Sequence, residues 1–495
     1  MDHRAKRSIA QGRSKWLLVV AAALALALAA ASCGGGGKEA APPATTAAPA
    51  TTAAPATTAA PATTEAAPAT ETTAAPAECP FPGGTITAFQ TMDLSGIAGD
   101  IGPSTARATG LWLDYTNAEG GILGCKIVVD QIEEPFADVD TCLKNWKNAI
   151  AQGDKYQFYF GSFNSACMAA VPDLTNAAGK AIIANSAADH QPFFNPKFKT
   201  YNFHGAVSTF LEGRASAKFA ADLGWKRVAI LAPNFAYGQD AANAFAEYFK
   251  QLVPDGEIVE RQEPEFNEKD FTPFINAIAS KNPDGVFSSF FGNFVLPFWK
   301  QWKAAGHEDI PTIGGLMDLP GWEQVKSADE IPKNSYAYDR GSWQRLATTQ
   351  VGKKFFDAYV AKYGTSEHPV PSAWTFAWVT GAEMAKALIE KTQSLNPDDW
   401  VAAVEAGDFT YQSPYRDDPT GVDPVNHMSD TCSELGPVVW DESLPVKASY
   451  DVSALKVYCM HDILPMSEAV QITTNPNVSE DAITAYEQIS GTPAG

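Results

Sequence analysis

The chain has 495 residues and a formal net charge of −21, with 57 aspartate and glutamate side chains against 36 lysine and arginine side chains. This length allows more than one domain. The acidic balance disfavours nucleic-acid binding, because that function needs basic patches.

The first 33 residues have the pattern of an export signal. Basic residues come first, an apolar run covers 16–31, and small residues precede Cys33. The run is shorter than the roughly 20 residues that a bilayer-spanning helix needs. The pattern predicts a lipoprotein signal peptide over 1–33, with Cys33 acylated as the new N-terminus. An ordinary secretory signal cleaved nearby is the alternative.

Residues 34–78 are predicted to form a disordered Pro/Thr/Ala-rich linker. The motif P-A-T-T-A-A recurs unchanged at Pro43, Pro49 and Pro55. Such a segment has almost no large apolar side chain and cannot bury a core. Its proline content favours an extended form, so the linker would act as a tether between a lipid anchor and the folded part.

From Thr85 onward, short β-rich runs alternate with helical patterns. The predicted strands cover 85–90, 126–132, 156–161, 181–184, 201–205, 227–233, 257–266, 284–293 (a strand with its loop) and 310–315. The predicted helices cover 103–119, 138–150, 165–178, 211–223, 239–252, 270–280, 296–305, 351–363 and 377–391. This alternation predicts an α/β fold with doubly wound parallel sheets. Because ligands of such sheets bind at the carboxyl ends of strands, the loop 91–96 is a candidate binding loop.

Four blocks of sequence carry a resemblance to a known family. They are DLSG (93–96) followed by NAEGGILG (117–124), GSFNSACMAAVPDL (161–174), AIIANSAADHQP (181–192) and RVAILAPNFAYGQDAANAF (227–245). In this order they resemble branched-chain amino-acid (leucine/isoleucine/valine-type) substrate-binding proteins of ABC transporters, which are type I periplasmic binding proteins. The resemblance covers about 85–322 and thins after roughly Ser335.

The resemblance implies two doubly wound parallel-sheet lobes joined by a multi-strand hinge. We expect the N-terminal lobe to contain 79–204 and 336–395. The C-terminal lobe is expected to contain 205–335 and 396–470, and 471–495 is expected to be a C-terminal tail.

Six cysteines remain besides Cys33. An even number in an exported protein favours disulfides, but six cysteines allow 15 pairings. The fold implied by the resemblance selects three of them, Cys79–Cys125, Cys142–Cys167 and Cys432–Cys459. No CxxC motif occurs and the histidines are scattered, so we expect neither a metal site nor a cofactor.

The resemblance also implies where a solute would bind. Ser165 matches a position that contacts a ligand carboxylate, and it is also predicted to be a helix N-cap, which would face the cleft without any ligand. Tyr237 matches an aromatic residue that packs on the ligand, although a plain core role is the alternative. The remaining positions implied by the resemblance are Ser95, Ile101, Ala187, Ala188, one cleft aromatic that is either Phe290 or Phe291, and Asp318.

Two departures bear on the chemistry of the solute. Ala188 stands where the family often has threonine, and Thr209 or Ser208 stands at an acidic position. A buried ammonium group without a carboxylate partner is costly. The candidate solutes are therefore an amino acid, a carboxylate without an amine, and an amide.

The resemblance implies a monomeric, extracytoplasmic receptor that is anchored to the membrane by lipid only and delivers its solute to an ABC permease. A sensor protein that signals to a membrane partner is the alternative. A secreted hydrolase is disfavoured, because the chain has no GxSxG motif, no HExxH motif and no paired histidines.

Overall fold

The computed structural model describes residues 78–95, 101–134, 138–162, 164–184, 200–265, 267–291, 294–316, 322–365, 368–473 and 475–490. The signal peptide, Cys33 and the tether up to residue 77 lie outside this part of the chain, so the expectations about them stay predictions. Within the described ranges, no helix combines the length and the apolar character that a membrane crossing requires.

The first sheet consists of parallel strands in the order β2-β1-β3-β4-β5. Successive side chains of β1 point to opposite faces. Phe89 packs against Trp146, with ring centres 5.4 Å apart, whereas Gln90 on the other face accepts a hydrogen bond from Trp378 at 2.9 Å. Both faces are therefore buried. The strands are β1 (Thr85–Met92), β2 (Lys126–Glu133), β3 (Phe158–Phe160), β4 (Ile182–Ala184) and β5 (Asn202–His204).

Helices cover both faces of this sheet and complete the first lobe. Trp146 belongs to α2 and Trp378 to α12, and both α11 and α12 pack on α1. The helices of this lobe are α1 (Ile101–Ala118), α2 (Val139–Ile150), α3 (Ser165–Met168), α4 (Val171–Ala177), α11 (Gln350–Tyr363), α12 (Ala373–Thr392) and α13 (Pro397–Glu405).

The second sheet, which defines the second lobe, has the order β14-β13-β10-β9-β8-β6-β7. Pairing is parallel from β7 to β10, whereas β13 is antiparallel to β10, β14 and β15. The strands are β6 (Arg227–Leu231), β7 (Glu257–Gln262), β8 (Gly285–Ser288), β9 (Thr312–Leu316), β10 (Ser335–Asp339), β13 (Cys432–Trp440), β14 (Ala448–Tyr450) and β15 (Lys456–Cys459).

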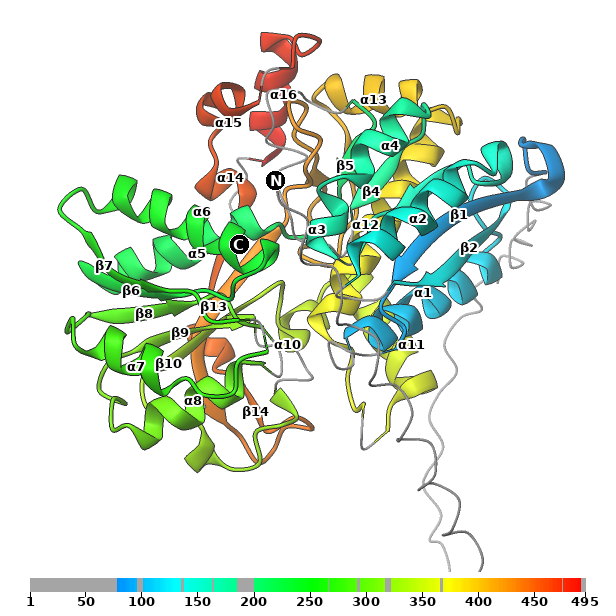
Figure 1. Cartoon of the computed structure of the whole chain (residues 1–495). Helices are drawn as coiled ribbons and strands as arrows, with labels where there is room; N and C mark the ends of the chain where they lie inside the picture. The colour runs from blue at the N-terminus through cyan, green and yellow to red at the C-terminus, as the bar shows by residue number, and fades with distance from the viewer. Residues whose placement is uncertain are drawn as a thin grey trace, which may run out of the picture. The chain divides into compact units, whose positions relative to one another are not determined.

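Two separate cores flank the second sheet. Val228 and Ile230 of β6 belong to one cluster, whereas Ala229 and Leu231 belong to the other, as the alternation of a strand requires. Figure 1 shows α5 and α6 on one face of the sheet and α7 and α8 on the other. The helices of this lobe are α5 (Thr209–Asp222), α6 (Ala236–Leu252), α7 (Thr272–Ala279), α8 (Val295–Ala304), α14 (Met460–Ile463) and α15 (Met466–Ile472).

The observed lobes differ from the expected boundaries in two places. The strand β10, expected at the start of a first-lobe segment, pairs with β9 in the second sheet. The helix α13 and the short strand β11 (Thr410–Tyr411) pack on α12 of the first lobe, although we expected them in the second lobe. A strand of two residues carries no periodic signal, so no pattern in the sequence assigns β11 to a lobe.

The expected C-terminal tail contains a packed helix. The helix α16 (Glu480–Ser490) lies on β12 (Thr420–Gly421), and the side chain of Tyr486 is only 3% exposed. Apolar burial thus holds most of this segment on the folded part, and 491–495 lie outside the described residues.

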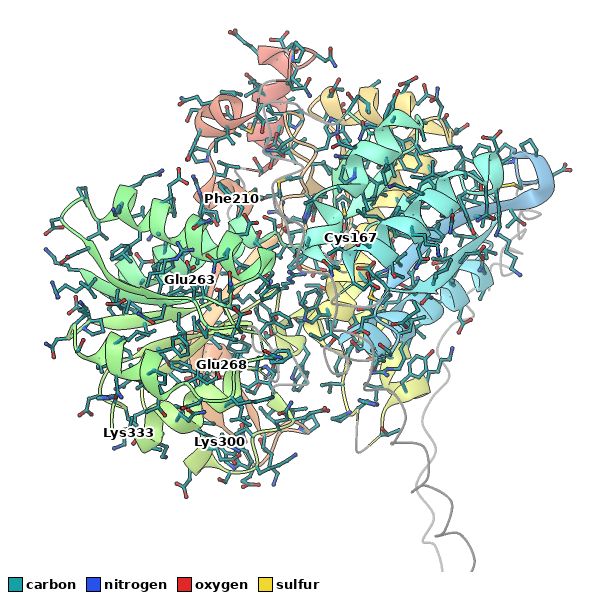
Figure 2. The ribbon with its side chains drawn as sticks, in the orientation of Figure 1. Cys167, Phe210, Glu263, Glu268, Lys300 and Lys333 are labelled. Carbon is teal, nitrogen blue, oxygen red and sulfur yellow. A yellow bond between two sulfur atoms is a disulfide. The ribbon has the colours of Figure 1, made fainter. Side chains whose placement is uncertain are left out.

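The structure contains the three disulfides that the fold hypothesis selected. Cys79 is bonded to Cys125, and Cys432 is bonded to Cys459 on the paired strands β13 and β15. The bond between Cys142 of α2 and Cys167 of α3 (labelled in Figure 2) joins two helices of the first lobe.

Three chain segments, 205–208, 340–349 and 422–431, cross between the lobes. The third lies beside the end of β5, where the first begins: the amide N of His204 donates to the carbonyl O of His427 at 3.0 Å, and the amide N of Ser429 donates to the carbonyl O of His204 at 2.8 Å. The described chain therefore has a multi-strand hinge, as expected.

A glycine permits close packing at this hinge. A methyl group on Gly205 would lie 2.4 Å from the Cα atom of Gly381 in α12.

We therefore expect Gly205→Ala to lower the free energy of unfolding by about 1–3 kcal/mol through overpacking, as measured by urea denaturation. Gly110→Ala is the matched control, because its methyl group would meet only the Tyr363 hydroxyl at 3.7 Å and alanine favours the helix. Equal destabilisation by both variants would contradict this account.

A charged triad crosses the hinge. The buried carboxylate of Asp430 accepts hydrogen bonds from Nη2 of Arg416 at 2.8 Å and lies 2.8 Å from Nδ1 of His461. Arg416 lies in the loop before β12, next to the first lobe, whereas His461 lies on α14 of the second lobe. Burial acts to lower the pKa of His461, but the hydrogen bond and charge of Asp430 outweigh it and raise the pKa above its ordinary value.

This triad makes stability depend on pH. Because the pKa of His461 is raised on folding, the stabilisation by its charge is complete below the unfolded-state pKa of about 6.5 and is lost as pH rises through the folded-state pKa. We expect the difference in unfolding free energy between the wild type and His461→Gln to shrink as pH rises. In an Asp430→Asn background, the effect of His461→Gln on the unfolding free energy should no longer depend on pH. If the difference between the wild type and His461→Gln stays constant with pH, the triad does not couple stability to pH.

Candidate functional site

The first-lobe side of the candidate site is the loop between β3 and α3. The buried Glu134 carboxylate accepts hydrogen bonds from the Ser162 hydroxyl at 2.7 Å and from the amide N of Asn164 at 2.6 Å. The disulfide of Cys167 ties the same short helix to α2. These contacts hold the loop at the carboxyl end of its strand, where a doubly wound sheet presents ligands.

Ser165 is the first residue of α3 and is 9% exposed. The N-cap is Asn164, whose side chain accepts a hydrogen bond from the amide N of Cys167. The expectation that Ser165 caps the helix is therefore wrong by one residue, because asparagine is an equally good N-cap.

The other first-lobe candidates are placed differently from one another. Ser95 is exposed and donates a hydrogen bond to Asp93 at 2.7 Å, whereas Ile101 begins α1 and is completely buried in the core. Ala187 and Ala188 lie outside the described residues, as does Asp318 of the second lobe.

The second-lobe side is an aromatic patch, which we define as Phe235, Tyr237, Phe291 and Phe294. The ring centre of Tyr237 lies 5.2 Å from that of Phe291 and 6.0 Å from that of Phe235. Phe294 extends the patch, 5.7 Å from Phe291. The four residues belong to the segments that follow β6 and β8. They lie close together because the carboxyl ends of these two parallel strands are on the same side of the sheet.

Of the two phenylalanines that the sequence left as alternatives, only Phe291 joins this patch. Phe290 is fully buried in the other core of the second lobe, where its ring centre lies 5.4 Å from that of Phe271. Neighbouring residues of an extended segment point to opposite sides, which explains the separation.

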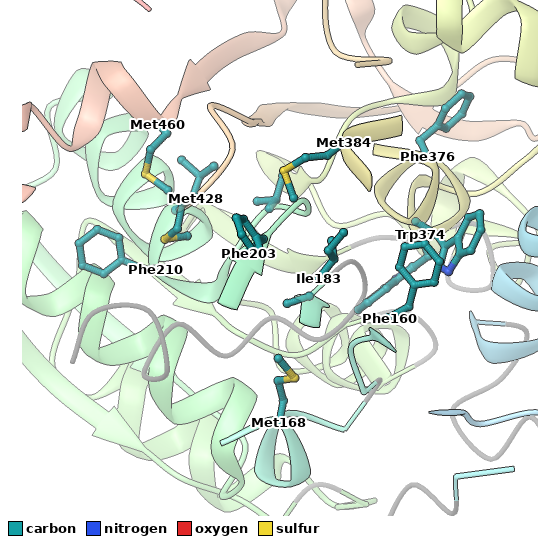
Figure 3. Packing of buried hydrophobic residues seen from close by; sticks show 14 of the residues in the cluster. Phe160, Met168, Ile183, Phe203, Phe210, Trp374, Phe376, Met384, Met428 and Met460 are labelled. Carbon is teal, nitrogen blue, oxygen red and sulfur yellow. The ribbon is translucent and has the colours of Figure 1, made fainter. Parts of the chain in front are cut away.

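A buried ion pair lies next to the patch. Nε of Arg340, which follows β10, donates to Oε1 of Glu212 on α5 at 2.7 Å, and both side chains are 0% exposed. The guanidinium carbon lies 4.0 Å from the ring centre of Trp374 at the start of α12, a buried residue of the cluster in Figure 3. The pair thus contacts both lobes.

Burial sets the protonation behaviour of this region. Loss of water raises the pKa of Glu212, and the charge and hydrogen bond of Arg340 oppose that rise without cancelling it. Burial, followed by the neighbouring charge of Glu212, raises the pKa of Tyr237 well above its ordinary value. The Tyr237 hydroxyl lies 3.1 Å from that of Tyr338.

Sequence reasoning missed this ion pair and Trp374. Glu212 and Arg340 are separated by 128 residues, and neither stands in a recognisable motif. The useful signal was a charged residue at an expected crossing between lobes, since Arg340 follows 336–339, where we expected the chain to return to the first lobe. We took the acidic position of the family to be filled here by Thr209 or Ser208 and expected no carboxylate there, but the structure has Glu212 one turn later on the same helix.

The side chains that could bind a metal ion do not converge in the described part of the chain. No group of three or more histidine, cysteine, aspartate and glutamate residues in these ranges is arranged to hold one.

Comparison with known proteins identifies the family. The model of the periplasmic binding protein family matches residues 90–439. The Leu/Ile/Val-binding protein homolog 8 of Brucella abortus is 23% identical over 332 residues, which cover 64% of this chain and 79% of that protein.

Solved structures agree in fold. An ABC transporter solute-binding protein of Rhodopseudomonas palustris in complex with 3,4-dihydroxybenzoic acid has a TM-score of 0.62 and 21% identity, covering 75% of this chain and 97% of its own. A branched-chain amino acid transporter substrate-binding protein of Streptococcus pneumoniae in complex with isoleucine has a TM-score of 0.60 and 22% identity, covering 76% and 99%. With two α/β lobes, a multi-strand hinge and a family match over 90–439, the chain belongs to the periplasmic binding protein family.

Proposed function

We propose that this chain is an extracytoplasmic, lipid-anchored receptor that captures a small solute between its lobes and delivers it to an ABC permease. The observation that carries the proposal is the contact between α3 of the first lobe and α6 of the second. These two helices bear Ser165 and Tyr237, the candidate residues expected to meet a solute from opposite sides.

The chemistry of the site supports a solute with an apolar body and a polar head. The aromatic patch offers ring surfaces for the body, and Phe235 and Phe294 are only partly buried. Ser165 offers a hydroxyl group for a carboxylate or an amide. Branched or aromatic amino acids, amine-free acids and their amides have this shape, and apolar walls with few polar groups are typical of small-molecule sites.

Lobe closure would supply the mechanism. A solute that contacts both lobes binds the closed conformation better than the open one and shifts the population towards it. The hinge segments allow this change without breaking either sheet. We propose a binding role without catalysis for the chain, as the matched proteins are solute-binding proteins.

A thermal-shift screen tests the receptor function. The panel contains branched and aromatic amino acids, amine-free acids of the same shape, and the matching amides. A solute at about 100 times its Kd should stabilise the protein by about 2.7 kcal/mol and raise the Tm. No shift with any compound would contradict a receptor for this class and would favour a different ligand or a sensor role.

We expect Tyr237→Ala to weaken binding of the best solute by about 10- to 100-fold, because a central aromatic contact is lost. Isothermal titration calorimetry measures the change. Tyr248→Ala is the control on the same helix, since its ring packs on Arg214, 4.6 Å from the guanidinium carbon, and is not part of the aromatic patch. If the two variants bind the solute equally well, Tyr237 does not contact it.

The lipid anchor is tested separately. Cys33→Ser removes the thiol that acylation requires, so the protein should move from the membrane fraction to the soluble fraction, as seen by immunoblotting. Ser32→Ala, which keeps Cys33, should remain with the membrane. Retention of the Cys33→Ser protein in the membrane would refute the anchor.

A further inference from the structure

Arg340 and Glu212 form an ion pair that is completely buried where the lobes meet. Their side chains are both 0% exposed, and Nε and Oε1 are 2.7 Å apart. Replacing such a pair by apolar residues is often neutral or stabilising, because desolvation of two charges offsets their attraction. Stability alone is therefore a weak reason for its presence.

The position of Arg340 favours a role in binding. Its guanidinium lies over the Trp374 ring of the first lobe, at 4.0 Å, while its Nε atom bonds Glu212 of the second lobe. Both charges of the ion pair act on Tyr237 of the aromatic patch: that of Glu212 raises the pKa of the tyrosine, and that of Arg340 lowers it. Arg340 thus lies beside the aromatic patch and contacts both lobes.

The two charges differ in how they can respond to a solute. Arginine stays protonated in proteins, whereas burial raises the pKa of the Glu212 carboxyl. An added negative charge can be accommodated if Glu212 takes up a proton from solvent. An added positive charge cannot be accommodated in the same way, because Arg340 would have to lose a proton and arginine does not.

The other groups that face Glu212 come from α5, α6 and β10. Asp240 of α6 accepts a hydrogen bond from the Thr209 hydroxyl, and its charge also acts to raise the pKa of Glu212. The charge of Glu212 acts on Tyr237 of α6, and the Tyr237 hydroxyl lies 3.1 Å from that of Tyr338 of β10. Each neighbouring carboxylate makes protonation of Glu212 easier.

We propose that Arg340 binds the carboxylate group of the solute, and that Glu212, its partner in the absence of solute, takes up a proton when that carboxylate arrives. The solute is then a small organic anion with an apolar body. This inference rests on the proposed function and adds to it a charged group, since Ser165 offers only a neutral hydroxyl. Arginine suits the task because its planar fork can bind a carboxylate through two hydrogen bonds.

The test compares carboxylates with amides of the same shape in the full-length protein. The probes are benzoate and benzamide, 4-methylpentanoate and 4-methylpentanamide, and leucine, measured by calorimetry between pH 5 and pH 8. We expect the wild type to bind a carboxylate more tightly than its amide, and more tightly as pH falls, because protonated Glu212 no longer repels the anion.

Single substitutions should have opposite effects. Arg340→Gln should weaken carboxylate binding by about 100-fold and leave amide binding little changed. Glu212→Gln should retain or strengthen carboxylate binding and remove its pH dependence. Where Arg340→Gln fails to fold because Glu212 is left buried and unpaired, the Arg340→Gln/Glu212→Gln double variant keeps a neutral pair and should also lose the preference for the carboxylate.

Three results would overturn the inference. If the wild type prefers amides, or binds only leucine and loses it in Glu212→Gln, then Arg340 does not select a carboxylate and the receptor function still stands; the leucine result would assign Glu212 to the ammonium group. If carboxylate binding survives in the double variant, Arg340 has a structural role only. If no probe binds the wild type, the proposed function fails for this class of solute, and the inference fails with it.

Discussion

The carboxyl ends of all strands in a parallel sheet lie on the same side of that sheet. This constraint brings together the candidate binding residues of both lobes. Ser165 follows β3, Tyr237 follows β6 and Phe291 follows β8. Arg340 follows β10, the last parallel strand of the second sheet. Residues far apart in the sequence therefore meet without any long excursion of the chain, and the hinge segments 205–208 and 340–349 also follow strands of the two sheets.

The hinge adds charge to this arrangement. Two charged groups are buried there. One is the ion pair of Arg340 and Glu212, and the other is the triad of Arg416, Asp430 and His461. Apolar residues could fill such positions at a lower cost in desolvation. Both groups contact elements of both lobes. Charge at the junction links the lobes more specifically than apolar packing would, because an ion pair requires a defined geometry.

Local signals predicted most of the elements, and the implied fold then predicted the disulfides. Strand and helix patterns up to residue 316 correspond to elements of the structure, because their periodicity is set by local burial. The choice between Phe290 and Phe291 depended on the last residue of a strand, which periodicity does not define. The pairing of Glu212 with Arg340 could not be predicted from the sequence, since no local pattern relates side chains 128 residues apart. The two-residue strands β11 and β12 were likewise too short to show a period.

The packing of α12 on α1 has a consequence for the order in which the lobes form. The sheet of the first lobe is complete at residue 204, but Trp112 of α1 packs against Trp378, with ring centres 5.8 Å apart. A chain that emerges from its N-terminus exposes this apolar face until residues 373–392 arrive, after most of the second lobe. The first lobe thus covers this face only after most of the second lobe has emerged, and until then the intermediate carries an exposed apolar surface that favours aggregation.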